Sequence, residues 1–178
     1  MPLPKEDHYT LADVLTWNEQ ERIELIDGAP VMMAPPSRAH QKISGELGRQ
    51  LGNYLDGKKC EVYAAPFAVR LFEKSGDRPE NVDTLVEPDD VGCKGAPDLI
   101  IEVLSPSTQR HDRLVKYNLY QRAGVREYWI VDPTAKSVQT FVLEDGHYTA
   151  ASFGSPDDVL KVSVLDGCFI ELSKVFPG

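Results

Sequence analysis

The stretch GAPDLIIEVLSPSTQRHDRLVKYNLYQRAGVREYWIVDP, residues 95–133, decides the fold of this chain. An apolar run at 99–104 and a second one at 127–132 are typical of buried strands. A carboxylate, Glu102, stands inside the first run. Because an unpaired carboxylate is costly to bury, Glu102 requires a partner, which can be a base, a backbone donor or a metal ion.

The segment between the two runs is expected to form a helix that ends at about Ala123. Pro106 stops the preceding strand, and Ser107 or Thr108 can cap the start of the helix. Gly124 follows the last helical residue, where a left-handed backbone is common.

The flanking sequence predicts a mixed α/β sheet with helices packed on it. Residues 38–55 carry an apolar side chain at every fourth position, which is one face of an amphipathic helix. Asp-Gly pairs at 27–28 and 145–146 each indicate a hairpin. A strand-like segment near 82–91 lies close enough to the run at 99–104 to pair with it as a further hairpin.

We expect one domain over residues 1–178, with its core at about 38–133 and a C-terminal hairpin and tail at 136–178. The chain has 178 residues, which suits one domain. It contains no apolar run of the roughly 20 residues that span a membrane, and its first residues lack the apolar core of a signal peptide. The expectation is a cytoplasmic protein without a membrane partner.

The formal net charge is −9, which argues against simple coating of nucleic acid through phosphate contacts. The charge is uneven, because residues 71–102 are acidic and residues 107–127 are basic. Two solvated faces would explain this pattern, and an acidic metal site is also compatible with it. The three cysteines form neither a CxxC pair nor a disulfide framework.

Alternation along a strand places Asp98, Glu102 and Leu104 on one face of the run at 99–104. In the hairpin expected above, Asp89 comes close to Glu102 across the strand pair. Two facing carboxylates repel each other unless a cation lies between them. Hard oxygen ligands of this kind suit Mg²⁺, and a metal-bound water can attack phosphorus.

Lys116 lies on the expected helix, four residues after Asp112. One interpretation is a surface ion pair between these two side chains. The other places Lys116 over the sheet beside the metal, where its charge stabilises a phosphate transition state. His40 is more simply a core or capping residue than a catalytic one, and Glu46 is by default a solvated acid.

The segment PDLIIEVLSPSTQRHDRLVKYNLYQRAGVREYWIVDP resembles the Uma-two family of restriction-endonuclease-like nucleases, as do IELIDGAPVMMAPPSRAHQKISGELGRQL and VEPDDV. The resemblance covers about residues 10–170. It implies a PD-(D/E)xK core, in which a four-stranded mixed sheet is flanked by helices and carries a Mg²⁺-dependent phosphodiesterase site, with Mn²⁺ as a possible substitute.

Carried over by position, the resemblance makes Asp89 and Glu102 the metal ligands. The motif lysine would fall on Leu104, and it is replaced by Lys116 on the following helix. Asp98 is a further motif position that could bind metal or hold the start of the strand, and Glu46 could supply an additional acid.

The leading hypothesis is therefore a metal-dependent endonuclease that acts on nucleic acid, with DNA as the expected substrate and a homodimer as the expected assembly. The first alternative is a catalytically inactive protein of nuclease fold that binds nucleic acid or a protein partner. The second is an interaction protein that dimerises through the edge of the hairpin at 145–146.

Overall fold

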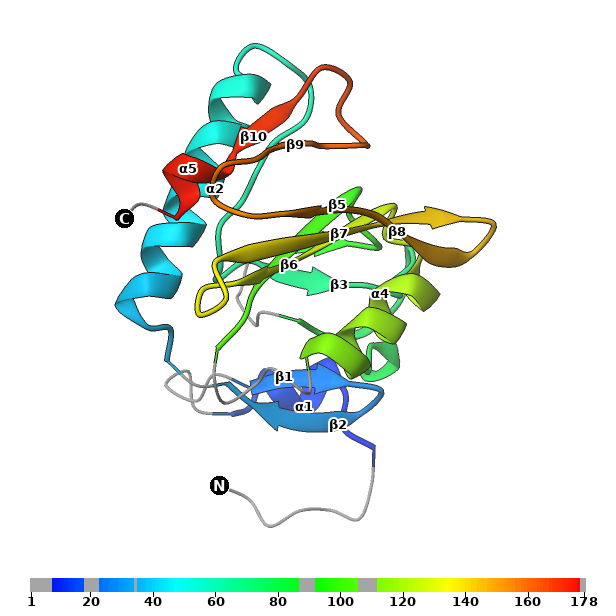
Figure 1. Cartoon of the computed structure of the whole chain (residues 1–178). Coiled ribbons are helices and arrows are strands. Elements are labelled where there is room, and N and C mark those ends of the chain that lie inside the picture. The colour runs from blue at the N-terminus through cyan, green and yellow to red at the C-terminus, as the bar shows by residue number, and fades with distance from the viewer. Residues whose placement is uncertain (1–7, 18–22, 34, 87–91, 106–111, 177–178) are drawn as a thin grey trace. The chain divides into compact units, whose positions relative to one another are not determined.

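A computed structural model describes residues 8–17, 23–33, 35–86, 92–105 and 112–176, with the backbone alone for Asp112. The contacts divide the chain into two compact units, which are described separately (Figure 1). Unit 1 comprises residues 1–35 and 65–97, and unit 2 comprises residues 36–64 and 98–178.

Unit 1 is built from short elements. They are α1 (Leu11–Val14), β1 (Ile23–Ile26), β2 (Ala29–Met32), β3 (Ala68–Arg70), the 3₁₀ turn η1 (Pro79–Asn81) and β4 (Gly92–Lys94). The hairpin of β1 and β2 turns at Asp27 and Gly28, whose φ angles of 47° and 75° are those of the expected type I′ turn. Leu25, Ala68 and Leu85 form the small core of this unit.

The hairpin expected between 82–91 and 99–104 is wrong for the residues that the structure describes. Leu85 and Val86 make only isolated bridges, to Leu25 and Val69. β4 pairs with β3 in parallel, and β5 (Leu99–Val103) pairs with the strand that follows it across a helix. Asp89 lies outside the described residues.

Unit 2 contains the two strands expected at 99–104 and 127–132. Its elements are α2 (Arg38–Leu55), β5, the π-helical turn η2 (Asp112–Lys116), α4 (Tyr117–Ala123), β6 (Glu127–Asp132), β7 (Ser137–Glu144), β8 (His147–Gly154), β9 (Val159–Lys161), β10 (Phe169–Glu171) and α5 (Leu172–Val175). The four longest strands form a sheet in the order β5-β6-β7-β8, in which the first pair is parallel and the others are antiparallel. This agrees with the mixed sheet predicted from the sequence.

Each face of the four-stranded sheet is covered by a different set of elements (Figure 1). On one face, strand residues such as Val103 and Trp129 pack with Leu47 of α2 and with buried residues of the tail, such as Ile170. On the other face, Tyr117 of α4 makes edge-on ring contacts with aromatic side chains of β6, β7 and β8. The amphipathic stripe expected on α2 is confirmed, since its four apolar residues are buried.

The helix that follows β5 begins with a wider turn. Residues 112–116 are π-helical and residues 117–123 are α-helical. Gly124 ends the helix with φ 86°, as expected. The amide of Gly124 donates to the carbonyl oxygens of Tyr120 and Gln121. Isolated π-turns of this kind are often found at functional sites.

The hairpin of β7 and β8 turns at Asp145 and Gly146, again as the sequence predicts. Its ladder is interrupted, because Thr140 pairs with Ser152 whereas Phe141 pairs with Ala150. Ala151 is therefore a bulged residue with no opposite partner in the ladder.

In the described parts of the chain, no helix has the length and apolar composition needed to cross a bilayer.

Candidate active site

Glu102 points to the face of the sheet that carries η2 and α4, and two donors reach one of its oxygens. Lys116 Nζ lies 3.0 Å from Glu102 Oε1, and the Tyr120 hydroxyl donates to the same atom at 2.5 Å. The Lys116 side chain is 4% exposed and the Glu102 side chain 15% exposed. This pair is therefore a buried ion pair with a narrow opening to solvent on the acid side.

The other carboxylate oxygen, Oε2, makes no hydrogen bond within the described residues. A carboxylate oxygen that is held in place and not shared with a donor is available to a hard cation. Glu102 thus fits the chemistry of a Mg²⁺ or Mn²⁺ ligand, with Lys116 on the opposite oxygen.

Burial acts on Glu102 in the direction that would raise its pKa. The charge of Lys116 and hydrogen bonds from Tyr120 and Lys116 outweigh burial, and the electrostatic influence of His40 acts in the same sense, so that the pKa lies below its ordinary value. Glu102 is therefore ionised at neutral pH, which is the state required of a metal ligand.

Local sequence explains how these side chains meet. Glu102 lies at the centre of β5, whose parallel pairing with β6 fixes which face it points to. Lys116 and Tyr120 are four residues apart, so they lie on one side of the helix after the π-turn. The crossover from β5 to β6 returns this helix over the sheet, because parallel neighbours require such a connection.

The sequence left two interpretations of Lys116 open, and its burial does not fit the first of them, a surface ion pair. A surface ion pair would leave the ammonium solvated, whereas Lys116 is 3% exposed and contacts Glu102. The side chain of Asp112 lies outside the described residues. Leu104, where the motif lysine would stand, is 2% exposed, and its amide donates to the carbonyl oxygen of Val131 at 2.8 Å.

The other candidate acids have partners of their own. Asp98 pairs with Arg126 at 2.9 Å, and both side chains are 63% exposed. Glu46 accepts hydrogen bonds from Arg49 and Gln50 on α2, and the bond from Arg49 is the main reason why its pKa is lowered. Among the described residues, no hydrogen bond or ion pair joins either acid to Glu102.

Asp89 lies outside the described residues, so the proposed pair of ligands is incomplete in what the structure describes. In the described ranges, no group of three or more His, Cys, Asp and Glu side chains is placed to hold a metal ion. The position of a second ligand therefore stays a prediction.

Tyr120 is a site residue that the sequence reasoning assigned only to packing. It does pack, since it is 1% exposed and its ring contacts Tyr128 edge-on, but its hydroxyl also binds Glu102. The available signal was its spacing of four residues from Lys116. The backbone amide of His40 donates to Ser37 Oγ, so Ser37 is the N-cap of α2.

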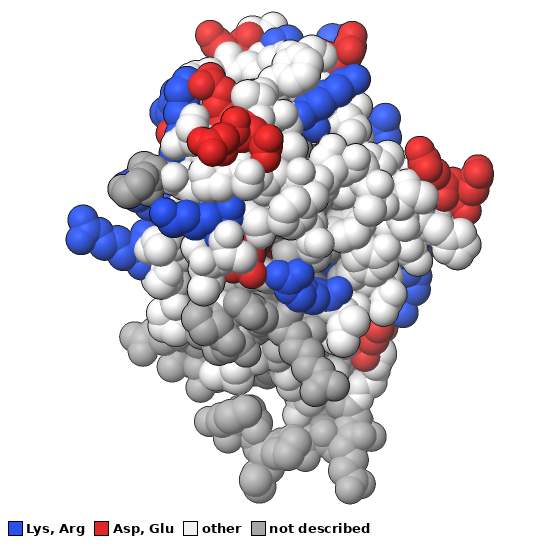
Figure 2. Space-filling model, in the orientation of Figure 1, with Lys and Arg blue, Asp and Glu red and all other residues white. Residues whose placement is uncertain are grey.

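A second charged cluster lies on the same helix turn. Arg113 Nη2 donates to Asp132 Oδ2 at 3.1 Å, and Arg113 Nη1 donates to Gln139 Oε1 at 3.2 Å. Asp132 also accepts from the amides of Thr134 and Ala135, which fixes its carboxylate at the end of β6. On the face shown in Figure 2, lysines and arginines lie among the acids, so the net negative charge does not exclude local basic regions.

The described residues of unit 2 form a mixed sheet with a buried pair of Glu102 and Lys116 on the face that carries η2 and α4, an arrangement compatible with a nuclease-type α/β fold. Comparison with known proteins gives the family. Residues 6–173 match the family described as "Uma2: Putative restriction endonuclease". The chain belongs to this family, as its motifs predict, and is thereby one of the restriction-endonuclease-like nucleases. Such nucleases act on nucleic acid and generally use divalent metal ions.

Two individual proteins are also similar to this chain. The chain is 28% identical over 163 residues to "Uncharacterized protein slr1290" of Synechocystis, across 88% of this chain and 84% of the relative. It also resembles the crystal structure of "a putative nuclease belonging to DUF820" from Anabaena variabilis, with a TM-score of 0.69 and 18% identity. That match covers 94% of this chain and 97% of the other, and it shows that the two share a fold.

Proposed function

We propose that this protein is a Mg²⁺-dependent endonuclease that hydrolyses phosphodiester bonds of DNA, with Mn²⁺ able to replace Mg²⁺. The observation that carries the proposal is the buried contact between Lys116 and Glu102, which places a cation beside an ionised carboxylate. Asp89 is proposed as the second ligand, with Asp98 and Glu46 as secondary candidates.

A bound divalent cation would polarise the scissile phosphate and lower the pKa of a coordinated water. Glu102 would hold this cation through Oε2 while Lys116 and Tyr120 hold Oε1. The positive charge of Lys116 can also stabilise negative charge on phosphate oxygens. Tyr120 orients the carboxylate and has no charge to place against phosphate.

The proposal extends to assembly. A nuclease with one site per chain cuts both strands of a duplex most simply as a two-fold dimer. We propose that the protein acts as a homodimer and that the two units work as one domain. Light scattering of the purified protein would measure the mass directly.

The decisive experiment is a cleavage assay on plasmid and on single-stranded DNA, with Mg²⁺, Mn²⁺, Ca²⁺ or EDTA. Cleavage in Mg²⁺ or Mn²⁺ should disappear in EDTA and in Glu102→Gln, which keeps the shape of the side chain but loses its charge. Glu171→Gln is the matched control, because it makes the same change at a glutamate outside the proposed site, whose side chain is 50% exposed and pairs with Lys174. Cleavage that persists in Glu102→Gln would show that the activity arises elsewhere.

The inactive alternative predicts a different pattern. DNA binding that weakens with salt, without cleavage in either metal, would favour a binding protein built on a nuclease fold. The same measurement with RNA distinguishes the two nucleic acids.

A further inference from the structure

One row of side chains crosses the four-stranded sheet from the Glu102 site to its outer edge. Glu102 pairs with Ile130 across β5 and β6, Ile130 pairs with Gln139, and Gln139 pairs with Phe153 on β8. Residues opposite each other in adjacent strands point to the same face of a sheet. The row therefore lies on the face that carries η2 and α4, with the buried Glu102 at one end and the ring of Phe153 at the other.

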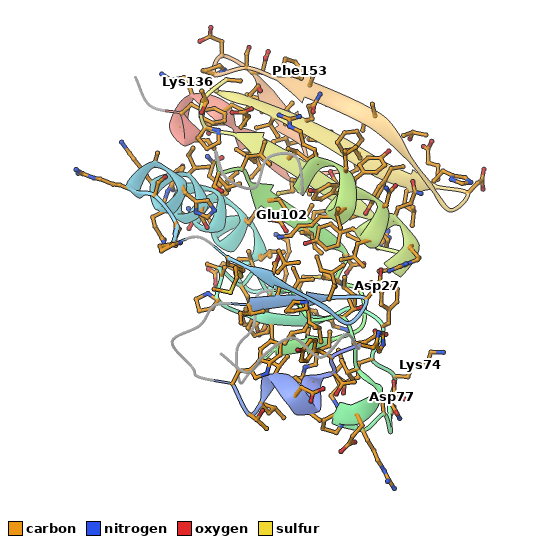
Figure 3. All side chains as sticks on the ribbon, turned by 90° about the horizontal axis from the view of Figure 1, so that it is seen from below. Asp27, Lys74, Asp77, Glu102, Lys136 and Phe153 are labelled. Carbon is orange, nitrogen blue, oxygen red and sulfur yellow. The ribbon has the colours of Figure 1, made fainter. Side chains whose placement is uncertain are left out.

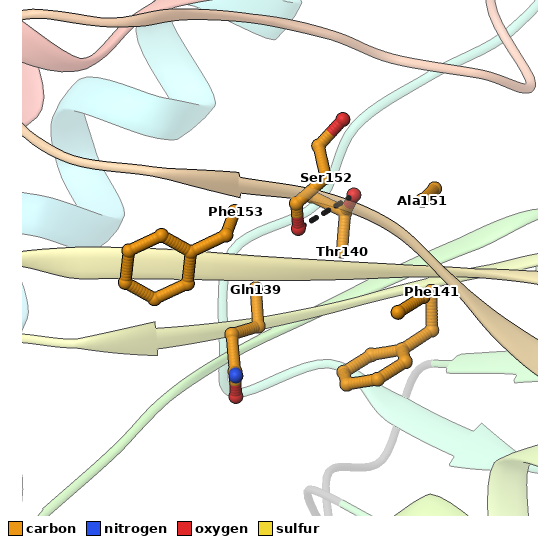
Figure 4. A pocket seen from close by; sticks show the side chains of 7 residues that line it. Gln139, Thr140, Phe141, Ala151, Ser152 and Phe153 are labelled. Atoms are coloured by element: carbon orange, nitrogen blue, oxygen red, sulfur yellow. Dashed lines mark hydrogen bonds between the residues drawn. The ribbon is translucent and has the colours of Figure 1, made fainter.

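Phe153 is unusual in this row because its side chain is 66% exposed. The bulge at Ala151 is what directs it to this face, since it shifts the alternation of β8 by one residue. In Figure 4, Phe153, Gln139 and Phe141 lie on one side of the strands and the Ser152 side chain lies on the other. Figure 3 labels both Glu102 and Phe153 on their strands.

Arg113 stands beside the middle of the row. Its guanidinium is anchored by Asp132 and Gln139, yet its side chain is 40% exposed. A guanidinium has five N–H donors, and the bonds to these two residues use two of them. The remaining donors of a positioned arginine are suited to a phosphate.

The surface around Phe153 is small and partly polar. A depression of about 300 Å³ is lined by Gln139, Phe153 and neighbouring residues of β7 and β8. The neighbours of Phe153 on its own strand, Ala150, Ala151 and Ser152, have short side chains and are exposed. A single aromatic ring between an amide, a guanidinium and small residues fits a flat ligand better than the broad apolar patch of a stable protein interface.

We propose that Phe153, Gln139 and Arg113 form a subsite for an unpaired nucleotide of the substrate, in which the base stacks on Phe153 and a phosphate binds Arg113. This inference rests on the proposed nuclease function, because it concerns the substrate of the Glu102 site. It names the substrate class as nucleic acid with a single-stranded segment a few nucleotides from the cleaved bond.

The geometry sets how far this nucleotide lies from the reaction. Three strand spacings of about 4.8 Å separate β5 from β8, which is about 14 Å. That distance corresponds to about four steps of a B-form strand at 3.4 Å per step, and to fewer steps of an extended strand. Bases inside an intact duplex have both faces stacked, so Phe153 can stack only on a base that is unpaired or at an end.

The test compares Phe153→Ala and Phe153→Trp with Phe169→Ala, a control at a phenylalanine of similar exposure on β10. Binding of a fluorescent single-stranded 12-mer and of a matching duplex is measured in Ca²⁺, which separates binding from cleavage. Loss of one base stack should weaken binding of the 12-mer about 5- to 150-fold. Phe153→Trp should retain the affinity, and its added fluorescence should be quenched by the 12-mer.

Arg113→Gln should weaken binding of the same 12-mer and reduce its salt dependence, whereas Phe169→Ala should change neither. Single abasic positions introduced along the 12-mer should remove the Phe153 effect at one position only. These results would support the subsite even if the wild-type protein proved unable to cleave, which is how failure of the nuclease proposal would be recognised.

Two outcomes would overturn the inference. One is a Phe153→Ala protein that cleaves and binds the 12-mer like wild type. The other is a change in mass by light scattering without a change in 12-mer binding, which would assign Phe153 to contact with a second copy of the chain.

Discussion

Replacing Lys116 by methionine tests the buried ion pair that the candidate site depends on. Methionine keeps most of the aliphatic stem of lysine and removes the charge. At 3.0 Å the attraction between Lys116 and Glu102 is about 5.5 kcal/mol for an effective dielectric constant of about 20. Part of this is offset by desolvation, and removal of one partner of a buried pair usually costs about 3–5 kcal/mol.

We expect the lower end of that range, a loss of about 3 kcal/mol in the free energy of unfolding, for two reasons. Glu102 keeps the hydrogen bond from Tyr120, and its side chain has some access to water. The double variant Glu102→Gln, Lys116→Met should recover about 1–2 kcal/mol of the loss, because it leaves no unpaired charge in the interior.

Urea unfolding followed by tryptophan fluorescence measures these values. Trp129 is fully buried in unit 2, and Trp17→Phe removes the tryptophan of unit 1 from the signal. The reasoning is refuted if Lys116→Met loses less than about 1 kcal/mol, or if the double variant is no more stable than Lys116→Met.

Three further predictions concern the same unit. Tyr120→Phe should lose about 1.5–3 kcal/mol of stability in urea unfolding, the usual value of a hydrogen bond to a charged group, while circular dichroism stays unchanged. Because the pKa of Glu102 is lowered by folding, its ionisation stabilises the protein above about pH 4.5, and the advantage of wild type over Glu102→Gln should shrink as the pH falls below that value. Gly154→Ala should lower the free energy of unfolding by about 1–3 kcal/mol in thermal unfolding, because its Cβ would lie 2.7 Å from Leu172 Cδ1. Gly45→Ala, whose Cβ would lie in open space on α2, should instead raise it by up to about 1 kcal/mol. Equal effects of the two variants would contradict this packing of Gly154.

Local signals in the sequence predicted the elements of this fold well. Both Asp-Gly pairs form the expected turns, because only a few residue types accept positive φ at two successive positions. The stripe on α2 and the glycine after α4 follow from equally local physics. Family motifs added the class of the fold and the pairing of Lys116 with Glu102.

Pairing between strands was less accessible. The expected hairpin between 82–91 and 99–104 rested on closeness in sequence, whereas β5 pairs with β6 across a whole helix. The succession of strand, helix and strand in residues 95–133 carried this information, because parallel neighbours need such a crossover. The role of Tyr120 was hidden for a related reason, since an aromatic residue on a buried helix face is first explained by packing.

The bulge at Ala151 separates β8 into two segments whose side chains alternate independently. Residues before it, such as Tyr148 and Ala150, and Phe153 after it occupy the same face although an odd number of positions separates Ala150 from Phe153. Deleting Ala151 would therefore leave a regular ladder in which Phe153 still pairs with Gln139. Inserting one residue beside it would also keep the ring on this face in a regular ladder, but it would move the partner of Phe153 two positions along β7, to Ser137. Strand β8 should accordingly tolerate the loss of a residue at this point better than a gain, an asymmetry that length variants of the hairpin would reveal.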